Sequence, residues 1–344
     1  MRSLATILLL CLAACGQGPA STAAPARVDG PARMPARGTG QAQKAAPNLT
    51  YRGGILLDQP RYTAIYWGSY WTTTKGRDDV SFYDAFLNTM AGSARFMSVT
   101  REYSRPEQPI GPGSYHGGIT VPTDPAVALN DTAIRDLIEA QLVAGTVPKA
   151  DPSQVYVVLL PPCVDVQAGP DKSCDQMCGY HWDLWSTTAP QRVPYVVIPH
   201  PDCWGCRFAA LHDLSVDELN RDSATVILSH EMIETVTDPV VGTGWYDDAN
   251  GEISDICGGQ GGFFDQGQLL GFRVQKHWSN EEKACVLERE IPVGSAGCPA
   301  ETHQVGSVCA PDLPASCASA RGSSAWSLLA AGLALVLRRR ASKR

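Results

Sequence analysis

The sequence predicts a mixed α/β (α+β) domain in which helices cover a central sheet and disulfides staple the chain. Residues 154–160 and 193–199 are continuous apolar runs that end at proline, a pattern typical of strands buried on both faces. Residues 131–144 space their apolar side chains as one helical face. The chain also holds 12 cysteines in 344 residues, a density that predicts disulfides in an exported protein.

The other elements of the domain, which we place at residues 49–290, follow in chain order. Residues 63–71 are β-branched and aromatic, which predicts a strand. Residues 80–98 carry one apolar face at helical spacing, interrupted by a glycine. Asp131 is placed to cap the helix over 131–144, and Pro194 stands near the start of its strand, where proline is tolerated.

The first 15 residues are typical of a bacterial export signal. One positive charge precedes a short apolar run that ends in Ala14-Cys15, which resembles a lipobox whose cysteine becomes lipidated. The alternative is an ordinary signal cut near Ala14. Residues 16–48 are rich in Ala, Pro, Gly and Gln with few large apolar side chains, so we expect a flexible linker.

The other end of the chain also indicates attachment to the cell envelope. We expect a cysteine-containing linker over 291–317 and then an anchor tail over 318–344, where an apolar stretch at 325–337 precedes three arginines. This order resembles the sorting tails of bacterial surface proteins, in which a cysteine, here Cys317, is retained. The alternative is a marginal transmembrane helix.

The charge of the chain argues against nucleic acid as a partner. The formal net charge is −7, and the two ends, 1–14 and 318–344, hold seven Lys or Arg and no Asp or Glu. The remainder therefore carries 21 basic and 35 acidic residues, a net charge of −14. Such a protein does not attract phosphate backbones.

Ten cysteines lie beyond residue 15, and two interpretations of them stay open. In an oxidising compartment they form disulfides, with a connectivity that spacing does not reveal. Four of them, in the spacings Cys174-x3-Cys178 and Cys203-x2-Cys206, could instead bind zinc as thiolates. The ten positions are 163, 174, 178, 203, 206, 257, 285, 298, 309 and 317.

The segment 222–239 carries the chemistry. Asp222 is a suitable N-cap for a helix, and Pro239 predicts that it ends near Thr237. His230 and Glu234 are four residues apart and share a helix face. In the His-Glu-x-x-His motif this spacing directs two ligands to one Zn²⁺, and the residue after the first His is the general base. Here Glu234 replaces the second His, and Glu231 is the candidate base.

A third ligand has to come from elsewhere, and we favour Asp255. If the segment 252–256 is extended, Glu252 and Asp255 face opposite ways, so that one points inward and the other stays in water. Glu252 is then a group that supports the ligands, and Asp238 lies two turns from His230. The alternatives are an exposed, solvated helix face without metal, or a structural Ca²⁺ site, which His230 disfavours.

Eight blocks of the chain, taken in order, resemble the phosphate-induced protein 1 family, also called EXORDIUM proteins, known as secreted plant cell-wall proteins. The segment 174–181 is similar to the Cys-Gly-Phe-His signature of that family. The blocks are 51–57, 65–71, 155–160, 174–181, 203–206, 229–239, 244–246 and 252–257. The resemblance implies the family's fold and an extracytoplasmic role, but no known reaction. The chain departs from the plant pattern at Asp238, where Asn is frequent, and in its additional Cys163 and Cys285.

The resemblance also draws His181 into the site, as a third ligand or as a group that polarises a substrate carbonyl. Together these features predict an exported, zincin-like Zn²⁺ hydrolase, such as a peptidase or amidase. Its substrate would be a peptide or a cell-wall or extracellular polymer. The competing hypothesis is a non-catalytic module that binds polysaccharide through aromatic side chains. Those side chains are Trp67, Tyr70, Trp71, Trp182, Trp185, Trp204 and Trp245.

Overall fold

The computed structural model describes residues 30–36, 45–208, 214–258, 264–293, 297–299, 302–305 and 307–311. The helices are α1 (Thr74–Gly92), α2 (Asp131–Ala144) and α3 (Val216–Thr237), with 3-10 helices η1 (Ser69–Thr72), η2 (Phe96–Tyr103), η3 (Trp204–Cys206) and η4 (Asp255–Cys257). The first ten strands are β1 (Ala32–Pro35), β2 (Thr50–Tyr51), β3 (Arg61–Trp67), β4 (Ser114–Val121), β5 (Ala128–Asn130), β6 (Gln154–Leu159), β7 (Asp165–Ala168), β8 (Asp171–Lys172), β9 (Met177–Trp185) and β10 (Arg192–Ile198). The remaining strands are β11 (Trp245–Tyr246), β12 (Gln266–Leu269), β13 (Phe272–Gln275), β14 (His277–Ser279), β15 (Ala284–Val286), β16 (Ile291–Pro292), β17 (Thr302–Val305) and β18 (Val308–Pro311).

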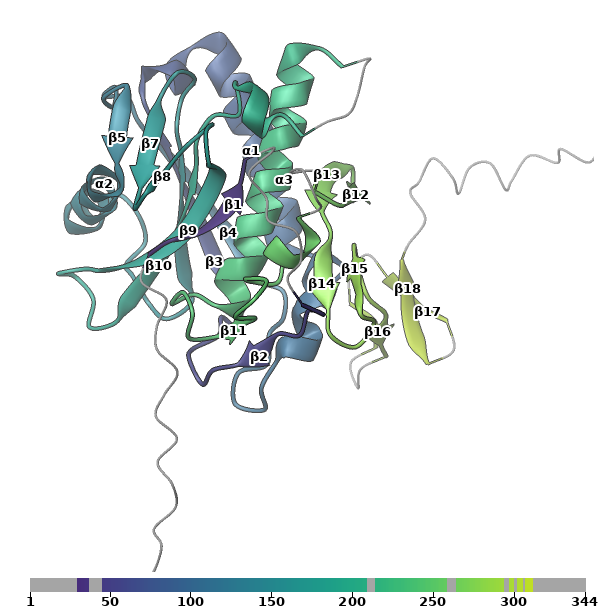
Figure 1. Ribbon diagram of the computed structural model, residues 1–344. Helices are drawn as coiled ribbons and strands as arrows, with labels where there is room; N and C mark the ends of the chain where they lie inside the picture. Colours follow the sequence, from purple (N-terminus) through teal and green to yellow (C-terminus); the bar gives the residue numbers. More distant parts are fainter. Residues whose placement is uncertain are drawn as a thin grey trace, which may run out of the picture.

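A six-stranded mixed sheet forms the centre of the molecule, with the order β1-β9-β10-β6-β3-β4. The neighbours β10, β6, β3 and β4 run parallel, whereas β9 is antiparallel to β10 and β1 is antiparallel to β9. The helices α1 and α3 lie on one side of this sheet and α2 on the other (Figure 1). The predicted mixed α/β class, with helices over a central sheet, is confirmed.

The buried strands serve two cores, as their continuous apolar sequence predicts. In β6, Val155 and Val157 belong to the core beneath α1 and α3, whereas Tyr156 and Val158 belong to the core beneath α2. Alternate side chains of a strand point to opposite faces, so a strand covered on both sides needs apolar residues at every position. This arrangement leaves α3 packed between the sheet and the strands that follow it.

The helix α3 begins earlier than we predicted. Its N-cap is Ser215, whose side chain accepts a hydrogen bond from the Glu218 amide, while the Glu218 side chain accepts one from the Ser215 amide. The helix ends at Thr237, as expected. Asp222 is not the cap and instead forms an ion pair with Arg273 at 3.0 Å. The predicted N-cap of α2, Asp131, is also wrong by one residue. The N-cap is Asn130, whose side chain accepts a hydrogen bond from the Ala133 amide.

Part of the segment expected to be a flexible linker is a strand. The chain from Ala32 to Pro35 forms β1 and pairs with β9 at the edge of the central sheet, where Met34 is fully buried. Met34 and Ala36 join the core under α3. Although the segment is poor in large side chains, one methionine and the free edge of β9 give it a docking place.

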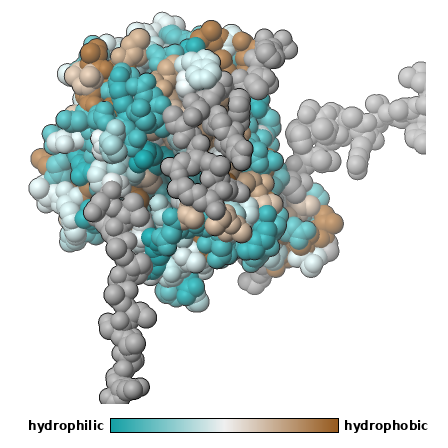
Figure 2. Space-filling model, viewed as in Figure 1, coloured by the Kyte–Doolittle hydropathy of each residue, from teal (hydrophilic) through white to brown (hydrophobic). Residues whose placement is uncertain are grey.

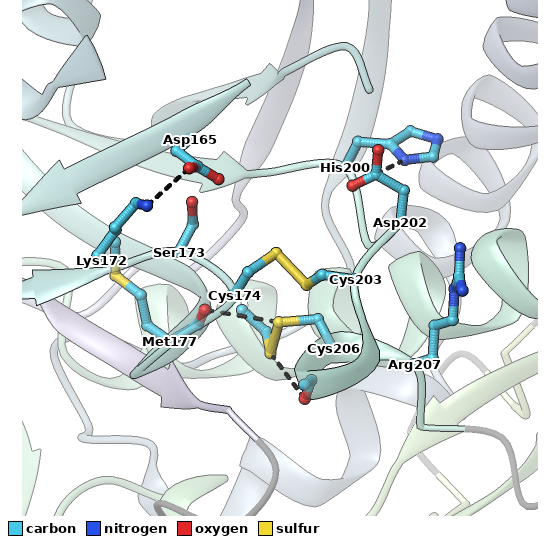
Figure 3. The surroundings of a disulfide bond; sticks show 12 residues. Asp165, Lys172, Ser173, Cys174, Met177, His200, Asp202, Cys203, Cys206 and Arg207 are labelled. Carbon is cyan, nitrogen blue, oxygen red and sulfur yellow. Dashed lines mark hydrogen bonds and ion pairs between the residues drawn. A yellow bond between two sulfur atoms is a disulfide. The ribbon is translucent and has the colours of Figure 1, made fainter. Parts of the chain in front are cut away.

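Four disulfides staple the described chain, in pairs that spacing did not reveal. They are Cys174–Cys203, Cys178–Cys206, Cys257–Cys285 and Cys298–Cys309. The first two lie side by side and tie the start of β9 to η3 (Figure 3). Cysteines bonded to each other are not thiolates, so the alternative of a four-thiolate zinc site does not hold. Within the described residues Cys163 forms no disulfide, and it is exposed.

The end of the described chain also differs from a plain linker. Strands β16, β18 and β17 form a small sheet that the Cys298–Cys309 disulfide closes. In the described ranges, no helix combines the length and the apolar character needed to span a bilayer. The predicted signal, the lipobox at Cys15 and the tail over 318–344 lie outside the described residues.

Candidate metal centre

The predicted motif lies on the buried part of α3. His230, Glu231 and Glu234 are all fully buried, as is nearly every residue from Asn220 to the end of the helix. The alternative of an exposed, solvated helix face is therefore wrong. A buried carboxylate or imidazole is costly unless a charge or a hydrogen bond compensates it, so the surroundings of these side chains determine what they can do.

The ring of His230 is held by Gln275 at the end of β13. Oε1 of Gln275 lies 2.9 Å from Nδ1 of His230, while Nε2 of the same amide donates to the carbonyl of Ser254 at 2.6 Å. Because the amide nitrogen is engaged elsewhere, its oxygen faces the ring and Nδ1 is the donor. The lone pair of the neutral ring is then on Nε2, the arrangement that a metal-binding histidine needs.

Two carboxylates surround that Nε2. Oε2 of Glu234 lies 3.0 Å away and Oδ1 of Asp255 lies 3.7 Å away. The other oxygen of Glu234, Oε1, accepts from the backbone amides of Ser254 at 3.2 Å and Asp255 at 3.1 Å. Glu234 is thereby fixed, with Oε2 directed at His230. A lone pair and a carboxylate oxygen this close repel each other unless a proton or a cation lies between them.

Asp255 reaches the cluster by a turn, not by the extended strand we predicted. It opens the 3-10 helix η4, and its side chain is 22% exposed, whereas Glu252 is fully buried. The expectation that one of these carboxylates points inward while the other stays in water is wrong, since both turn toward α3. Gly251 permits this, because a Cβ there would lie 2.5 Å from Oδ2 of Asp255 and its φ is +92°.

His181, on β9, faces Glu231 from the sheet. Its Nδ1 lies 3.2 Å from Oε2 of Glu231, and its Nε2 lies 3.6 Å from Oε1 of Glu252. Burial lowers the pKa of His181, but the hydrogen bond and charge of Glu231 outweigh it and raise the pKa. Gly179 lets β9 approach α3, since a Cβ there would lie 2.4 Å from Cγ2 of Ile227.

The remaining oxygen of Glu231 is covered by the N-terminal strand. The Met34 amide of β1 donates to Oε1 at 3.1 Å. In Figure 1, β1 lies beside β9 at the edge of the central sheet. The candidate base is thus enclosed by His181 on one oxygen and by backbone on the other.

Asp238 is buried at the end of α3 but has its own partners. Its Oδ1 accepts from the amides of Thr243 at 3.0 Å and Gly244 at 2.6 Å, and its Oδ2 accepts from Gly242 at 2.6 Å. These bonds hold the loop after α3, and Asp238 is not part of either group of potential ligands described below. Its side chain also contacts Glu252, and the negative charge of Asp238 helps to raise the pKa of that carboxyl group.

The titration behaviour reflects this crowding of acids. Burial lowers the pKa of His230, but the charge of Glu234 and other carboxylates overcomes it and raises the pKa to about 10. Burial, together with Glu234, raises the pKa of Asp255 to about 8. Burial also raises the pKa of Glu252 well above its usual range, with Glu234 adding to the effect. The cluster thus holds protons at neutral pH, which a bound cation would displace.

The residues fit a divalent cation. Two groups could hold one, namely His230 with Glu234 and Asp255, and His181 with Glu234 and Glu252, each with ligand atoms within 4.8 Å of one another. Among the described residues, Nε2 of His230, Oε2 of Glu234, Nε2 of His181 and both carboxylate oxygens of Glu252 are buried without a hydrogen-bond partner. Nitrogen and oxygen donors of this kind suit Zn²⁺ and similar ions, whereas calcium prefers oxygen alone.

Most of the aromatic residues named for sugar binding are not strongly exposed. Of the seven candidates, only Trp185 and Trp204 are strongly exposed, at 64% and 71%, and Trp71 is fully in the core. Arg192 lies over the ring of Trp185. On the face shown in Figure 2, hydrophobic residues lie in separate small patches among hydrophilic ones.

Sequence reasoning missed several groups around the centre. Gln275, Met34 and His277 carry no motif, and each lies far along the chain from α3. His277 is buried behind Ser254, with Nδ1 2.9 Å from the Ser254 hydroxyl, and burial lowers its pKa to about 3. A buried polar side chain such as Gln275 is recognisable only once the strand that carries it is placed against the helix.

Comparisons of the chain with protein-family models, with curated proteins and with solved structures found no match. The resemblance to EXORDIUM proteins and the zincin-like architecture therefore stay predictions.

Proposed function

We propose that the protein is an exported, metal-dependent hydrolase, zincin-like in its use of α3, that cleaves an amide bond in a peptide or an extracellular polymer. One observation carries this proposal. Nε2 of His230 is buried between two carboxylates, 3.0 Å from Oε2 of Glu234 and 3.7 Å from Oδ1 of Asp255, while its other nitrogen is held by Gln275. Two carboxylates that converge on one buried imidazole nitrogen form the nitrogen and oxygen donor set that Zn²⁺ takes.

In this proposal His230, Glu234 and Asp255 hold Zn²⁺ or a similar ion. The cation would supply Lewis-acid chemistry, polarising the scissile carbonyl and making a water molecule more acidic. Gln275 and the amides of Ser254 and Asp255 keep the ligands in place. Such supporting contacts are typical of metal sites in which the protein presets the ligand geometry.

Glu231 is the group that moves the proton. Its carboxylate takes a proton from the water whose oxygen bonds to the carbonyl carbon, and it returns that proton to the nitrogen as the carbon–nitrogen bond breaks. Burial raises the pKa of Glu231, which brings a carboxylate closer to the pKa that general acid–base catalysis favours. The nearby Nδ1 of His181 orients the carboxylate, in place of the oxyanion role that we predicted for it.

The surroundings of the domain agree with a role outside the cytoplasm. Four disulfides indicate an oxidising environment. Attachment through a lipidated Cys15 or the C-terminal tail, and membership of an EXORDIUM-like group, belong to the proposal and rest on the sequence alone. The acidic mature chain favours a substrate other than nucleic acid.

The proposal is tested by metal content and hydrolysis measured on the same samples. Wild type, His230→Ala, Glu231→Gln and the exposed control Glu107→Gln are analysed by mass spectrometry for metal and assayed against a fluorogenic peptide library and isolated cell-wall polymer. We expect Glu231→Gln to keep the metal and lose activity by about 100-fold or more, His230→Ala to lose both, and Glu107→Gln to match wild type. Wild type without metal after incubation with Zn²⁺ would refute the proposal.

A further inference from the structure

The proposed function uses the ligand group of His230, Glu234 and Asp255. A second group, His181 with Glu234 and Glu252, could also hold a cation. His181 and Glu252 are fully buried and converge with Glu234 so that one ligand atom from each lies within 4.8 Å of the others. His181 comes from β9, Glu252 from the loop before η4, and Glu234 from α3. Three separate elements therefore bring these side chains to one place.

Like the first group, the second contains a histidine Nε2 and carboxylate oxygens that are buried without a hydrogen-bond donor. Nε2 of His181 and both oxygens of Glu252 are buried and receive no hydrogen bond from a nitrogen or hydroxyl donor among the described residues, and Glu252 faces the carboxylate of Asp238. The nearest charged neighbour of Glu252 on the ring side is Nε2 of His181 at 3.6 Å, and Asp238 adds a second negative charge beside it. Burying the Glu252 carboxylate is costly without a positive charge beside it, and a bound cation would supply that charge.

The two histidines are presented in the same way. Nδ1 of His230 faces Oε1 of Gln275 at 2.9 Å, and Nδ1 of His181 faces Oε2 of Glu231 at 3.2 Å. Each Nε2 is left beside carboxylate oxygens without a partner. A histidine whose Nδ1–H is bound to an oxygen acceptor presents a lone pair on Nε2, which is the usual preparation of a metal ligand.

Glu234 joins the two groups through one atom. Its Oε1 is occupied by two backbone amides, and its Oε2 lies 3.0 Å from Nε2 of His230 and 3.7 Å from Nδ1 of His181. That oxygen stands between the two rings. In hydrolases with two metal ions, the ions lie about 3.5–4 Å apart, a separation that a single shared carboxylate can bridge.

The charges of the centre also favour two ions. The five carboxylates are Glu231, Glu234, Asp238, Glu252 and Asp255, and within the described residues none of them forms an ion pair with Lys or Arg. Four of them pair with histidine, and Asp238 accepts from backbone amides. Two divalent cations with neutral histidines would nearly neutralise these acids, whereas one would leave about three negative charges to be neutralised by protons.

We propose that the centre binds two divalent cations that share Oε2 of Glu234, the first on His230 and Asp255 and the second on His181 and Glu252. This inference rests on the proposed function for the first ion and extends it to a second. The second position, with two carboxylates and one imidazole, suits Mn²⁺ as well as Zn²⁺. A pair of ions would allow the centre to hold both the attacking and the leaving group of a hydrolysis.

The test is a count of ions per folded chain. The purified protein is freed of metal, incubated with Zn²⁺ or Mn²⁺, and measured by native mass spectrometry beside Glu252→Gln, His181→Asn and Asp255→Asn, with folding checked by circular dichroism. We expect two ions in wild type, one in each of these three variants, and a spin-coupled Mn²⁺ pair in the electron paramagnetic resonance spectrum of wild type only.

The outcomes separate this inference from the proposed function. One ion in wild type, unaffected by Glu252→Gln and His181→Asn but lost in Asp255→Asn, would overturn the second site and leave the first. No ion in wild type would overturn both. Because Glu252→Gln and His181→Asn change different elements, a folding failure in one of them leaves the other to decide the result.

Discussion

Oε1 of Gln275 lies 2.9 Å from Nδ1 of His230, and this contact orients the histidine at the centre of the site. The two residues are 45 positions apart, on β13 and α3. The Gln275 amide is itself held, because Nε2 donates to the Ser254 carbonyl and the backbone nitrogen donates to the Ser229 hydroxyl. Helix, strand and loop thus determine together which ring nitrogen faces the carboxylates.

Replacing Gln275 with leucine removes the hydrogen bond that orients His230 but keeps a side chain of similar size. Nδ1 of His230 then loses its acceptor, and the ring can place its proton on Nε2, where it blocks metal binding. We expect Gln275→Leu to weaken Zn²⁺ affinity by about 10–100-fold, as measured by competition with a chromogenic chelator.

Gln154→Leu is the matched control for this variant. Gln154 is buried on β6 and donates to the Thr63 hydroxyl and the Val155 carbonyl, away from the site. It should lower the free energy of unfolding by about 1–3 kcal/mol without changing Zn²⁺ affinity. Equal losses of affinity in both variants would mean that Gln275 acts through general stability alone.

The stability of the metal-free protein should fall as pH rises above about pH 6.5. In the folded chain the pKa of Asp255 is raised to about 8 and that of His230 to about 10. A group whose pKa is raised on folding stabilises the fold fully below its unfolded pKa and ceases to do so as pH passes through the folded value. The contribution of Asp255 is therefore lost between about pH 4 and about pH 8, and that of His230 between about pH 6.5 and about pH 10. His277, whose pKa burial lowers to about 3, acts in the opposite direction below about pH 6.5, so the net fall is expected above that pH.

Urea unfolding in the presence of a chelator, from about pH 6.5 to about pH 9, measures this dependence. Zn²⁺ should remove most of it at the alkaline end, because the cation replaces the displaced protons. Asp255→Asn cannot ionise and should flatten the profile in the region below about pH 8. A stability that rises with pH in the chelated wild type would contradict the prediction.

The sequence predicted the fold class and the central helix because both depend on local pattern. Continuous apolar runs gave β6 and β10 almost to the residue, and helical spacing gave α2 with its observed bounds. The start of α3 was missed because Ser215 and Glu218 form a capping box ahead of Asp222, outside the apolar pattern. Boundaries depend on single hydrogen bonds, which periodicity does not report.

The site was predictable only where its residues share one helix. His230, Glu231 and Glu234 follow from spacing, and Asp255 was placed near them for the wrong reason, since its segment is a turn and not a strand. Gln275 and the Met34 amide could not be found in this way. Their role arises from tertiary contacts across 45 and 197 positions.

The Cys257–Cys285 disulfide should strengthen metal binding as well as stabilise the fold. Cys257 closes η4, the turn that begins with Asp255. The double variant Cys257→Ala/Cys285→Ala should lose about 3–4 kcal/mol in the free energy of unfolding and also bind Zn²⁺ more weakly.

The Cys174–Cys203 disulfide provides the comparison, because its sequence separation of 29 nearly equals the 28 of Cys257–Cys285. The variant Cys174→Ala/Cys203→Ala should lose a similar free energy of unfolding but keep its Zn²⁺ affinity. Calorimetric titration at a temperature where both variants are folded distinguishes the two effects. Equal affinities in the two variants would show that η4 holds Asp255 without the disulfide.

Strand β1 should control access to Glu231. The Met34 amide donates to Oε1 of Glu231, and the Met34 side chain is fully buried in the core under α3. Proline has no amide hydrogen, so Met34→Pro removes this donor and leaves a buried carboxylate oxygen without its partner. We expect β1 to separate from β9, which would expose the candidate base to solvent.

Three measurements follow from this expectation. In Met34→Pro, the amides of β9 should exchange hydrogen faster, protease should cut near residue 34, and a chelator should remove bound Zn²⁺ more quickly than in wild type. If the proposed hydrolase is enclosed by β1, its activity should rise. Met34→Leu keeps both the amide and an apolar side chain, so it should behave as wild type.

Hydrogen exchange, cleavage and metal release that stay unchanged in Met34→Pro would contradict the prediction. Substrate would then have to reach Glu231 by another route, and the candidate is the side of the centre nearest the partly exposed Asp255.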